Sequence, residues 1–286
     1  MKLSKNINIL IVGLGLLGGS YAKALTKQGY NVSAIARRRE TIDYALKNGI
    51  ISRGTDVVEP ELVSNADLVV FALYPHIFIE WVKQYQQLFK SGAVITDVTG
   101  VKGGIVDKVQ GMLRGDVEFI SAHPMAGKEV CGLENSDESI FRGANYIVVP
   151  TEKNTPGAIE LCRDLGEKLG FYQISELSVS EHDDMIAFLS QLTHCIAVSL
   201  MCCNDTPDLE YYTGDSFRDL TRIARINDEM WSELFLDNSK ALLSEMDRFR
   251  SSFDELYEKI KTGDREGIRG MMRVSTERRK RFDKLV

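Results

Sequence analysis

The fold of this chain is decided by the stretch Ile7–Leu25, which reads I-N-I-L-I-V-G-L-G-L-L-G-G-S-Y-A-K-A-L. Its first part, Asn8–Val12, is an apolar, branched run of strand length. Gly13, Gly15 and Gly18 follow at the spacing G-x-G-x-x-G, and a helical pattern begins after them. A strand, a glycine turn and a helix in this order are typical of a site that binds the pyrophosphate of a dinucleotide.

Each glycine has a physical reason in such a site. Gly13 permits the tight turn, Gly15 leaves the backbone open to a pyrophosphate, and Gly18 lets the helix pack closely on the strand. The helix, which we expect over Ser20–Gln28, has amides at its N-terminus that favour an anion. A bare tight turn without a ligand is the alternative, because glycine turns are common. The expected cofactor contacts in this stretch are Gly13, Gly15, Leu16, Leu17 and Gly18.

Composition narrows the class of protein. The chain has 286 residues, of which 44% are hydrophobic and 27% charged, as in an ordinary soluble globular protein. A net charge of -6 and a pI near 5.4 argue against a nucleic-acid or membrane surface, so an anionic ligand has to be bound by local arginines. The cysteines are odd in number and lack C-x-x-C spacing, which predicts no disulfide framework, no metal site and a cytoplasmic location: Cys131, Cys162, Cys195, Cys202 and Cys203.

Beyond the glycine turn, strand-like and helical patterns alternate. The expected strands are Asn31–Ala36, Leu68–Ala72, Val94–Val98, Glu118–Ala122, Tyr146–Val149 and Phe171–Ile174. The expected helices are Arg39–Asn48, Pro75–Phe89, Lys102–Leu113 and Pro156–Leu169, the last with Thr155 as N-cap and Gly170 as C-cap. This alternation predicts an α/β fold, a Rossmann-type domain with a mostly parallel sheet and helices on both faces.

The pattern changes near residue 176. Strand signals vanish, Ser180 and Asp183 have the spacing of a capping box, and helical runs continue to about Phe282. We therefore expect a dinucleotide-binding domain over residues 1–176 and a helical domain over residues 177–286. The uncharged run Met185–Cys203 has nearly the length of a membrane span, but it contains polar residues and no second span exists. We expect this helix to be buried, against a partner subunit, and not to enter a membrane.

Two loops after expected strands are candidates for chemistry, because ligands of parallel sheets bind beyond the carboxyl ends of the strands. They are D-V-T-G-V-K-G over Asp97–Gly103 and H-P-M-A-G over His123–Gly127. His123 would lie where a nicotinamide ring binds, and an imidazole there can act as a base or a hydrogen-bond acceptor. The alternative is a loop histidine that is hydrogen-bonded to the backbone.

The helical half offers three further candidates. Gln191 and His194 lie three residues apart on one face of the apolar helix, and Trp231 follows in D-E-M-W. Each has a structural alternative, since a buried histidine or tryptophan more often fills a core than contacts a ligand. His76 and His182 are expected at the surface.

A cluster of charges in the segment Gly214–Arg225 has two interpretations. Arg218 and Arg222 are spaced i, i+4, with Asp215 and Asp219 nearby. Most such clusters are solvated, salt-bridged surfaces. The alternative is a guanidinium group that binds a substrate carboxylate, which an acidic protein needs if its substrate is acidic.

From the glycine turn through Trp231, the chain resembles the prephenate and arogenate dehydrogenase family of tyrosine biosynthesis. The resemblance rests on five motifs in family order: G-L-G-L-L-G-G-S, D-V-T-G-V-K-G, H-P-M-A-G-K-E-V-C-G, S-Q-L-T-H and S-F-R-D-L-T-R-I-A. It implies an NAD(P)-dependent oxidative decarboxylation, in which hydride leaves the ring carbon that bears the hydroxyl, carbon dioxide is lost and the ring becomes aromatic. It also implies a homodimer formed through the helical domain.

The resemblance assigns roles to individual residues. His123 matches the catalytic histidine that accepts a hydrogen bond from the substrate hydroxyl, and Arg222 matches the arginine that binds a substrate carboxylate, which Asp219 would orient. His194 matches a histidine that lines the substrate pocket, and we count His194 with the catalytic residues. Trp231 matches a position on the substrate side of the site. Gln191 and Thr99 complete the expected substrate contacts, and Leu73 and Thr99 the expected cofactor contacts.

The chain departs from the family pattern in two places. Gly100 stands where many relatives carry a serine that contacts substrate and cofactor, so either Thr99 or a water would replace that serine. The expected second strand ends in A-R-R-R, without the carboxylate that holds the ribose hydroxyl of NAD. Arg37 and Arg38 suit a ribose phosphate instead, so we predict that NADP is preferred to NAD.

Two other functions remain open at this point. Another β-hydroxyacid-type dehydrogenase would need a catalytic lysine on the helix after the domain boundary, and Met185–Cys203 has none. A non-catalytic nucleotide-sensing module would bind the cofactor without turnover. The sequence leaves open whether prephenate or arogenate is the substrate and whether tyrosine inhibits.

Overall fold

The structure is a computed structural model and describes residues 2–128 and 130–282. The chain divides into two compact units, Met1–Asn238 and Ser239–Val286. This division reflects compactness and does not test the predicted functional boundary near residue 176, which stays a prediction.

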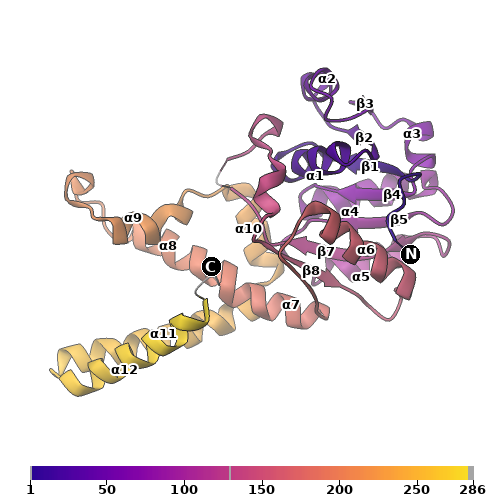
Figure 1. Ribbon diagram of the computed structural model, residues 1–286. Helices are drawn as coiled ribbons and strands as arrows, with labels where there is room; N and C mark the ends of the chain where they lie inside the picture. The colour runs from indigo at the N-terminus through magenta and orange to yellow at the C-terminus, as the bar shows by residue number, and fades with distance from the viewer. Residues whose placement is uncertain (1, 129, 283–286) are drawn as a thin grey trace. The chain divides into compact units, whose positions relative to one another are not determined.

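The centre of the first unit is β1 (Asn8–Val12), the strand that leads into the glycine turn. It belongs to a six-stranded sheet with the order β3-β2-β1-β4-β5-β6, in which every neighbouring pair is parallel (Figure 1). The other strands are β2 (Asn31–Ile35), β3 (Arg53–Thr55), β4 (Leu68–Phe71), β5 (Val94–Asp97) and β6 (Glu118–Phe119). The predicted parallel sheet is therefore confirmed.

Helices cover both faces of this sheet, because alternate residues of each strand are apolar on opposite sides. In β1, Ile9 and Ile11 pack in one buried cluster, and Leu10 and Val12 pack in the other. The first cluster includes buried residues of α1 (Leu16–Lys27), α2 (Arg39–Lys47) and α6 (Pro156–Leu169). The second includes α3 (Pro60–Ser64), α4 (Pro75–Tyr85) and α5 (Ile105–Met112).

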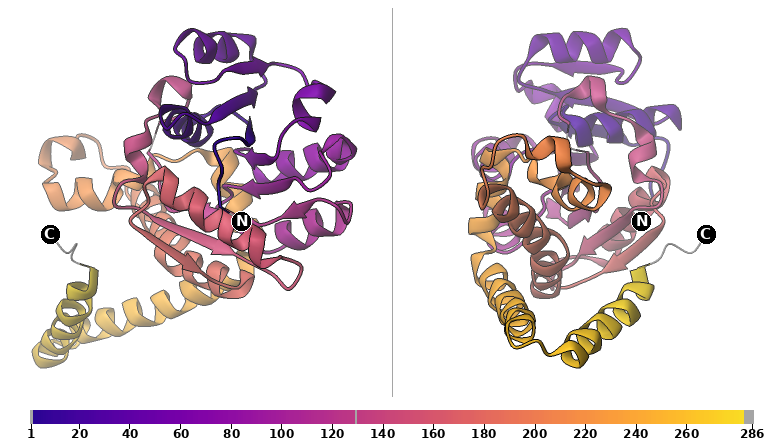
Figure 2. Two further views of the ribbon diagram at one scale, coloured as in Figure 1. Left: turned by 45° about the vertical axis from the view of Figure 1, so that its right-hand side comes forward. Right: turned by 90° about the vertical axis from the view of Figure 1, so that its left-hand side faces the viewer.

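The prediction of a single strand over Glu118–Ala122 was wrong, because this segment contains β6 and the start of a further strand that belongs to a second sheet. Ile120 still donates to the Ile95 carbonyl, but the amide of Ala122 donates to the Asp97 carboxylate, so the backbone ladder ends there. The chain then enters a second sheet of three strands, β7 (Ser121–Pro124), β8 (Asn145–Val149) and β9 (Gln173–Glu176), with β7 antiparallel to β8. α6 packs on this sheet (Figure 2).

Several helix ends differ from those expected. Thr155 and Gly170 cap α6 as predicted, the latter at φ 86°. The capping box predicted at Ser180 and Asp183 was wrong, because the box is formed by Ser178 and Glu181, and α7 (Val179–Ile186) begins earlier. α5 begins at Ile105 and not at Lys102, since the amides just before it donate to the carboxylate of Asp183. α1 begins at Leu16, ahead of the expected Ser20, where two consecutive glycines obscure the helical pattern.

Most of the uncharged run lies in one continuous helix, which is made of α7, a π-helical turn (Ala187–Gln191) and α8 (Leu192–Cys202). By length and composition alone this helix is able to cross a bilayer, which is weak evidence, and only 28% of its most apolar window is buried within the chain. Its burial against a partner subunit stays a prediction. The 3-10 helices Leu209–Tyr212 and Arg222–Ala224 follow, with α9 (Asp215–Thr221) and α10 (Asp228–Asp237).

The second unit is a helical hairpin. α11 (Ser239–Lys261) packs on α12 (Arg265–Arg279), and a 3-10 turn (Lys280–Phe282) ends the described chain (Figure 1). Gly263 turns the chain between the helices at φ 71°, and the Asp264 carboxylate caps α12 by accepting from the amide of Gly267. The helical C-terminal part of the predicted fold is therefore confirmed.

Candidate active site

The glycine turn has the geometry that its spacing predicts. Gly13 has φ +100°, and a Cβ added to it would lie 2.4 Å from the carbonyl oxygen of Ala72. A Cβ on Gly18 would lie 1.9 Å from the carbonyl oxygen of Gly13, so only glycine allows α1 to approach the turn this closely. A Cβ on Gly15 would meet no atom within 4 Å, which means that its Cα faces open space. The site fits a pyrophosphate against this backbone.

The surroundings of the turn agree with the same interpretation. α1 begins at Leu16, directly after Gly15, and no side chain caps it, so the amides of its first turn, including Leu17, have no side-chain acceptor. Leu73, which follows β4, is half-buried, and its Cδ2 lies 2.9 Å from the position of a Cβ on Gly13. Leu73 therefore borders the glycine turn, as expected for a cofactor contact.

Arg37 and Arg38 follow β2 at the same edge of the sheet, and both are exposed. Within residues 2–128 and 130–282, neither guanidinium is paired with a carboxylate. Arg39 differs, because its guanidinium lies 2.9 Å from Asp43 and 3.7 Å from Asp56. Arg37 and Arg38, the two arginines predicted to bind a ribose phosphate, are thus the two of the three whose guanidinium groups are not paired with a carboxylate among the described residues.

A buried ionic cluster lies beneath this edge. Lys102 is fully buried, and its Nζ donates to Asp97 Oδ2 (2.8 Å) and to the Ala122 carbonyl (2.7 Å). Asp97 Oδ1 accepts from the hydroxyl of Ser121 (2.6 Å). The hydroxyl of Thr99 donates to Asp97 and is 3.2 Å from Lys102 Nζ, so Thr99 is engaged inside the protein and not at the open edge. The cluster fixes the start of β7, the strand that carries His123.

His123 is hydrogen-bonded to a second histidine. Its Nδ1 lies 2.9 Å from Nε2 of His182, and Nδ1 of His182 lies 2.7 Å from Oδ1 of Asp183. The prediction that His182 is a surface residue was therefore wrong: its side chain is fully buried. The error follows from the misplaced capping box, which put His182 and Asp183 in an exposed first turn.

The environment keeps both imidazoles neutral. Desolvation lowers the pKa of His123 well below its ordinary value, and the nearby His182 and Lys102 lower it further, although the residue keeps some exposure at the edge. Burial also lowers the pKa of His182, against the opposing effect of its hydrogen bond to Asp183. A neutral imidazole has one bare nitrogen, which can accept a proton.

Gly100 lies in front of His123. A Cβ added to Gly100 would be 4.0 Å from Nε2 of His123 and 3.5 Å from Cδ1 of Leu234, which are ordinary contact distances. There is therefore room for a side chain at this position, and the backbone of the loop after β5 leaves it empty. Because Leu234 belongs to α10, the helical segment reaches the carboxyl edge of the sheet here.

α10 also brings two predicted substrate residues together. The rings of His194 and Trp231 stack with centroids 3.7 Å apart and planes 29° apart. Gln191 is buried, and its amide donates to the Leu234 carbonyl (2.7 Å) and accepts from Asn238 (2.8 Å). Gln191 therefore holds α10 in place beside the histidine and tryptophan.

The arginine cluster separates into two kinds of residue. Arg218 is exposed and donates to Asp215 at 2.8 Å, which is the ordinary surface pair. Arg222 is exposed in the 3-10 helix Arg222–Ala224, which packs against α8, the helix that carries His194. Asp219 is exposed in α9, which packs against the same helix.

Sequence reasoning placed Asp97 and Lys102 in a candidate loop without assigning them a role, and it gave no site role to His182, Asp183 and Leu234. One signal was present for the histidine. His182 and Asp183 extend the buried stripe of Ile186 and Ala187 by one helical turn toward the N-terminus, at the spacing of residues that share a helix face.

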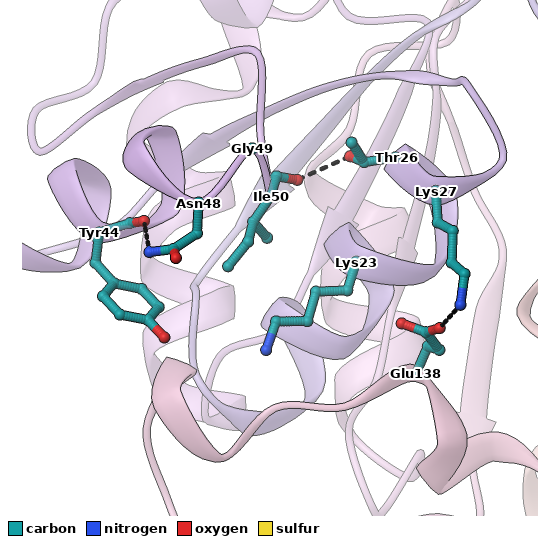
Figure 3. Close-up of a pocket in the computed structure, with 8 residues that line it drawn as sticks. All are labelled: Lys23, Thr26, Lys27, Tyr44, Asn48, Gly49, Ile50 and Glu138. Carbon is teal, nitrogen blue, oxygen red and sulfur yellow. Dashed lines mark hydrogen bonds and ion pairs between the residues drawn. The ribbon is translucent and has the colours of Figure 1, made fainter.

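A hollow of about 520 Å³ lies away from this edge (Figure 3). It is lined by Lys23, Thr26, Lys27, Tyr44, Asn48, Gly49, Ile50 and Glu138. Apart from Glu138, which begins the 3-10 helix Glu138–Phe141, these residues are at or just after the C-terminal ends of α1 and α2. Those ends lie next to the amino ends of the strands, since helices run opposite to strands in such a fold. Lys27 pairs with Glu138, and Nζ of Lys23 donates to the Ser136 carbonyl (2.6 Å), so both lysines of the hollow are already engaged. The hollow is not part of the candidate active site.

Comparisons with known proteins agree with this geometry. The family profile described as "Prephenate dehydrogenase, nucleotide-binding domain" matches residues 21–174, and "Prephenate dehydrogenase, dimerization domain" matches residues 178–274. The chain is 30% identical to a prephenate dehydrogenase of Lactococcus lactis subsp. cremoris over 268 residues, which cover 91% of this chain and 73% of that protein. It is 29% identical to a cyclohexadienyl dehydrogenase of Zymomonas mobilis over 271 residues, covering 90% and 89%.

A solved structure is similar over nearly the whole chain. The crystal structure of prephenate dehydrogenase from A. aeolicus, in complex with hydroxyphenyl propionate and NAD+, superposes with a TM-score of 0.89. The two sequences are 30% identical, and the match covers 99% of this chain and 100% of that one. On its two profile matches and this similarity, the chain belongs to the prephenate dehydrogenase family.

Proposed function

We propose that this protein is an oxidoreductase that carries out the oxidative decarboxylation of prephenate or arogenate with a nicotinamide cofactor. The observation that carries the proposal is the position of His123. A neutral imidazole stands at the carboxyl edge of the sheet, where Gly13, Leu73 and Gly100 follow the ends of three neighbouring strands. Membership of the family supports the reaction class, because the relatives carry prephenate and cyclohexadienyl dehydrogenase names.

His123 acts in this proposal through Nε2. As the substrate hydroxyl becomes a carbonyl, its proton has to be accepted by a base within hydrogen-bond reach. The desolvated ring of His123 is neutral and therefore able to accept that proton. The bound nicotinamide supplies the acceptor for the hydride. The empty position at Gly100, 4.0 Å from Nε2, leaves room in front of this nitrogen for the hydroxyl or for a bridging water.

The substrate carboxylate is assigned to Arg222, with Asp219 orienting its guanidinium. In a chain of net charge -6, a dianionic or zwitterionic substrate has to be bound by a local cation. His194 and Trp231 line the same pocket in this proposal, because their stacked rings offer a flat apolar surface for a six-membered ring. Gln191 supports that wall from behind through its bond to α10.

NADP is the proposed cofactor. Arg37 and Arg38 are exposed beyond β2 without carboxylate partners among the described residues, and a ribose phosphate accepts charge-assisted hydrogen bonds from such groups. No Asp or Glu stands at the end of β2 to hold the ribose hydroxyl of NAD, since the chain reads A-R-R-R there.

We further propose that the protein works as a cytoplasmic homodimer. The helix from Val179 to Cys202 is largely uncovered within the chain although it is apolar, and it lies in the segment that matches the dimerization profile. Phe188, Leu189 and Met201 are among its exposed side chains. Covering such a surface with a second copy removes apolar area from water.

The test is a paired assay of nicotinamide reduction with prephenate and with arogenate, each with NADP and with NAD at matched concentrations. We expect turnover with at least one substrate, and faster turnover with NADP. His123→Asn is the matched variant, and it should cut the maximal rate at least 100-fold while leaving cofactor affinity unchanged. Cofactor binding without turnover of either substrate would instead support a nucleotide-sensing protein and refute the proposal.

A further inference from the structure

A second histidine, His182, contacts His123 from the buried side. His182 has no exposed surface, so it meets neither substrate nor cofactor directly. Its two ring nitrogens are both used, Nε2 toward His123 at 2.9 Å and Nδ1 toward Asp183 at 2.7 Å. A buried histidine with two such partners has its ring orientation fixed by them.

The hydrogen-bond partners of Asp183 determine where the protons lie. The amide of Lys102 donates to its Oδ1 (2.9 Å), and the amide of Gly103 donates to its Oδ2 (2.6 Å). Backbone amides can only donate, so both oxygens of Asp183 act as acceptors. Nδ1 of His182 must therefore carry a hydrogen, and in the neutral ring its Nε2 is bare. Nδ1 of His123 must then donate to that bare nitrogen, which leaves Nε2 of His123 without a hydrogen.

We propose that His182, oriented by Asp183, is a positioning residue that holds His123 in the Nδ1–H tautomer and so presents a bare Nε2 to the substrate hydroxyl. The proposal rests on the proposed function, in which His123 accepts the hydroxyl proton. The opposite tautomer would put a hydrogen on Nε2, which could then donate to the hydroxyl oxygen but could not accept its proton.

The same arrangement stabilises the charge that the reaction creates. The O–H bond of the substrate breaks, the proton binds Nε2 of His123, and the electron pair of that bond forms the carbonyl as the ring carbon gives up its hydride, for which the nicotinamide would be the acceptor. The resulting imidazolium donates from Nδ1 to His182, whose other nitrogen donates to the carboxylate of Asp183. The charged groups that face His182 are Asp183, Asp97 and Lys102, and the cation of Lys102 is itself paired with Asp97.

Two substitutions separate this role from simple packing. His182→Phe keeps a flat ring of similar size but has no acceptor for His123 and no donor for Asp183. His182→Gln keeps both functions, since its amide oxygen accepts and its amide nitrogen donates. We expect His182→Phe to lower kcat about 100-fold or more, as expected when a catalytic imidazole takes the wrong tautomer, and to change KM and NADP affinity less than about 3-fold. His182→Gln should recover at least about 10-fold of that loss.

The tautomer is read directly by long-range ¹H–¹⁵N NMR of protein labelled with ¹⁵N-histidine. The chain has only 4 histidines, so each ring is assignable by substitution. We expect His123 in the Nδ1–H form in the unsubstituted protein and in His182→Gln, and a change toward Nε2–H in His182→Phe.

Either of two results would overturn the inference: an Nε2–H tautomer of His123 in the unsubstituted protein, or an unchanged kcat in His182→Phe. If His182→Phe does not fold, the unsubstituted protein and His182→Gln still decide the question by NMR. Because the spectrum needs no turnover, a protein that fails to oxidise either substrate would refute the proposed function and leave the tautomer measurable.

Discussion

The proposed cofactor preference gives the sharpest mutational prediction, because the chain supplies its own control. Three consecutive arginines follow β2, and carboxylates bind only the third among the described residues. We predict that Arg37→Ala and Arg38→Ala weaken the affinity for NADP, whereas Arg39→Ala does not. Arg39 already pairs with Asp43 and Asp56, so its guanidinium is not directed at a ligand.

The expected magnitude follows from the exposure of the two side chains. A hydrogen bond to a charged group contributes about 1.5–3 kcal/mol, and we take the lower end because both arginines are exposed to solvent. About 1.4 kcal/mol corresponds to a factor of 10 in affinity, so each single substitution should raise the KM for NADP roughly 10-fold. The double variant should raise it up to about 100-fold if the two contributions are independent. kcat should change less than about 2-fold, because neither side chain lies at the reacting atoms.

The assay is steady-state nicotinamide reduction with each cofactor, at low and at high salt. The KM for NAD should stay within about 2-fold in all three variants, since NAD carries no ribose phosphate. The effect on NADP should diminish at high salt, where exposed charges are screened. Equal NADP affinity in the double variant and the unsubstituted protein would refute the reasoning, as would better turnover with NAD than with NADP before any substitution.

Three further predictions concern the site and its stability. Gly18→Ala should abolish cofactor binding, because the added methyl group would lie 1.9 Å from a carbonyl oxygen. Gly100→Ala is the control and should bind NADP normally, because its methyl group would have contacts of 3.5 Å or more. Calorimetry measures both affinities, and tight binding by Gly18→Ala would contradict the geometry of the turn. Arg222→Ala should raise the KM for the substrate about 10-fold or more with a smaller change in kcat, and an unchanged KM would remove Arg222 from the pocket. The pKa values of His123 and His182 are lowered in the folded protein, so below the ordinary histidine pKa of about 6.5 the unfolded chain binds protons that the folded chain does not. We therefore predict that the free energy of unfolding has its full value above about pH 6.5 and falls as the pH drops below it. Urea unfolding at pH 7.5 and 5.5 measures this fall, which His123→Asn should reduce; a stability that is flat with pH would show that the folded histidines titrate normally.

The sequence predicted the parallel sheet and the glycine turn because their signals are local. The strand Asn8–Val12 and the three glycines each depend on neighbours within a few residues, and the branched runs of buried parallel strands are continuous. β3 and α3 were missed because three and five residues are too few to show a period. The break at Ile120 was missed for another reason: the partner that ends the strand is the side chain of Asp97, 25 residues from the amide it binds.

The candidate site was predictable in part for the same reason. His123 was proposed from its place after an expected strand, although it lies within β7, and Arg222 was proposed from a motif; their roles stay predictions. His182 was not found, because its role depends on contacts with residues 59 positions away and on a helix that begins two residues earlier than expected. The stacking of His194 on Trp231 likewise joins α8 to α10, which no local pattern specifies.

The central claim is that a neutral His123 accepts the hydroxyl proton of prephenate or arogenate in an NADP-dependent oxidation. The most direct test is the rate of NADPH formation with each substrate, for the unsubstituted protein and for His123→Asn under saturating cofactor. We predict turnover of at least one substrate that falls at least 100-fold in the variant, with an unchanged Kd for NADP. No NADPH formation with either substrate, or a His123→Asn variant as fast as the unsubstituted protein, would contradict the claim.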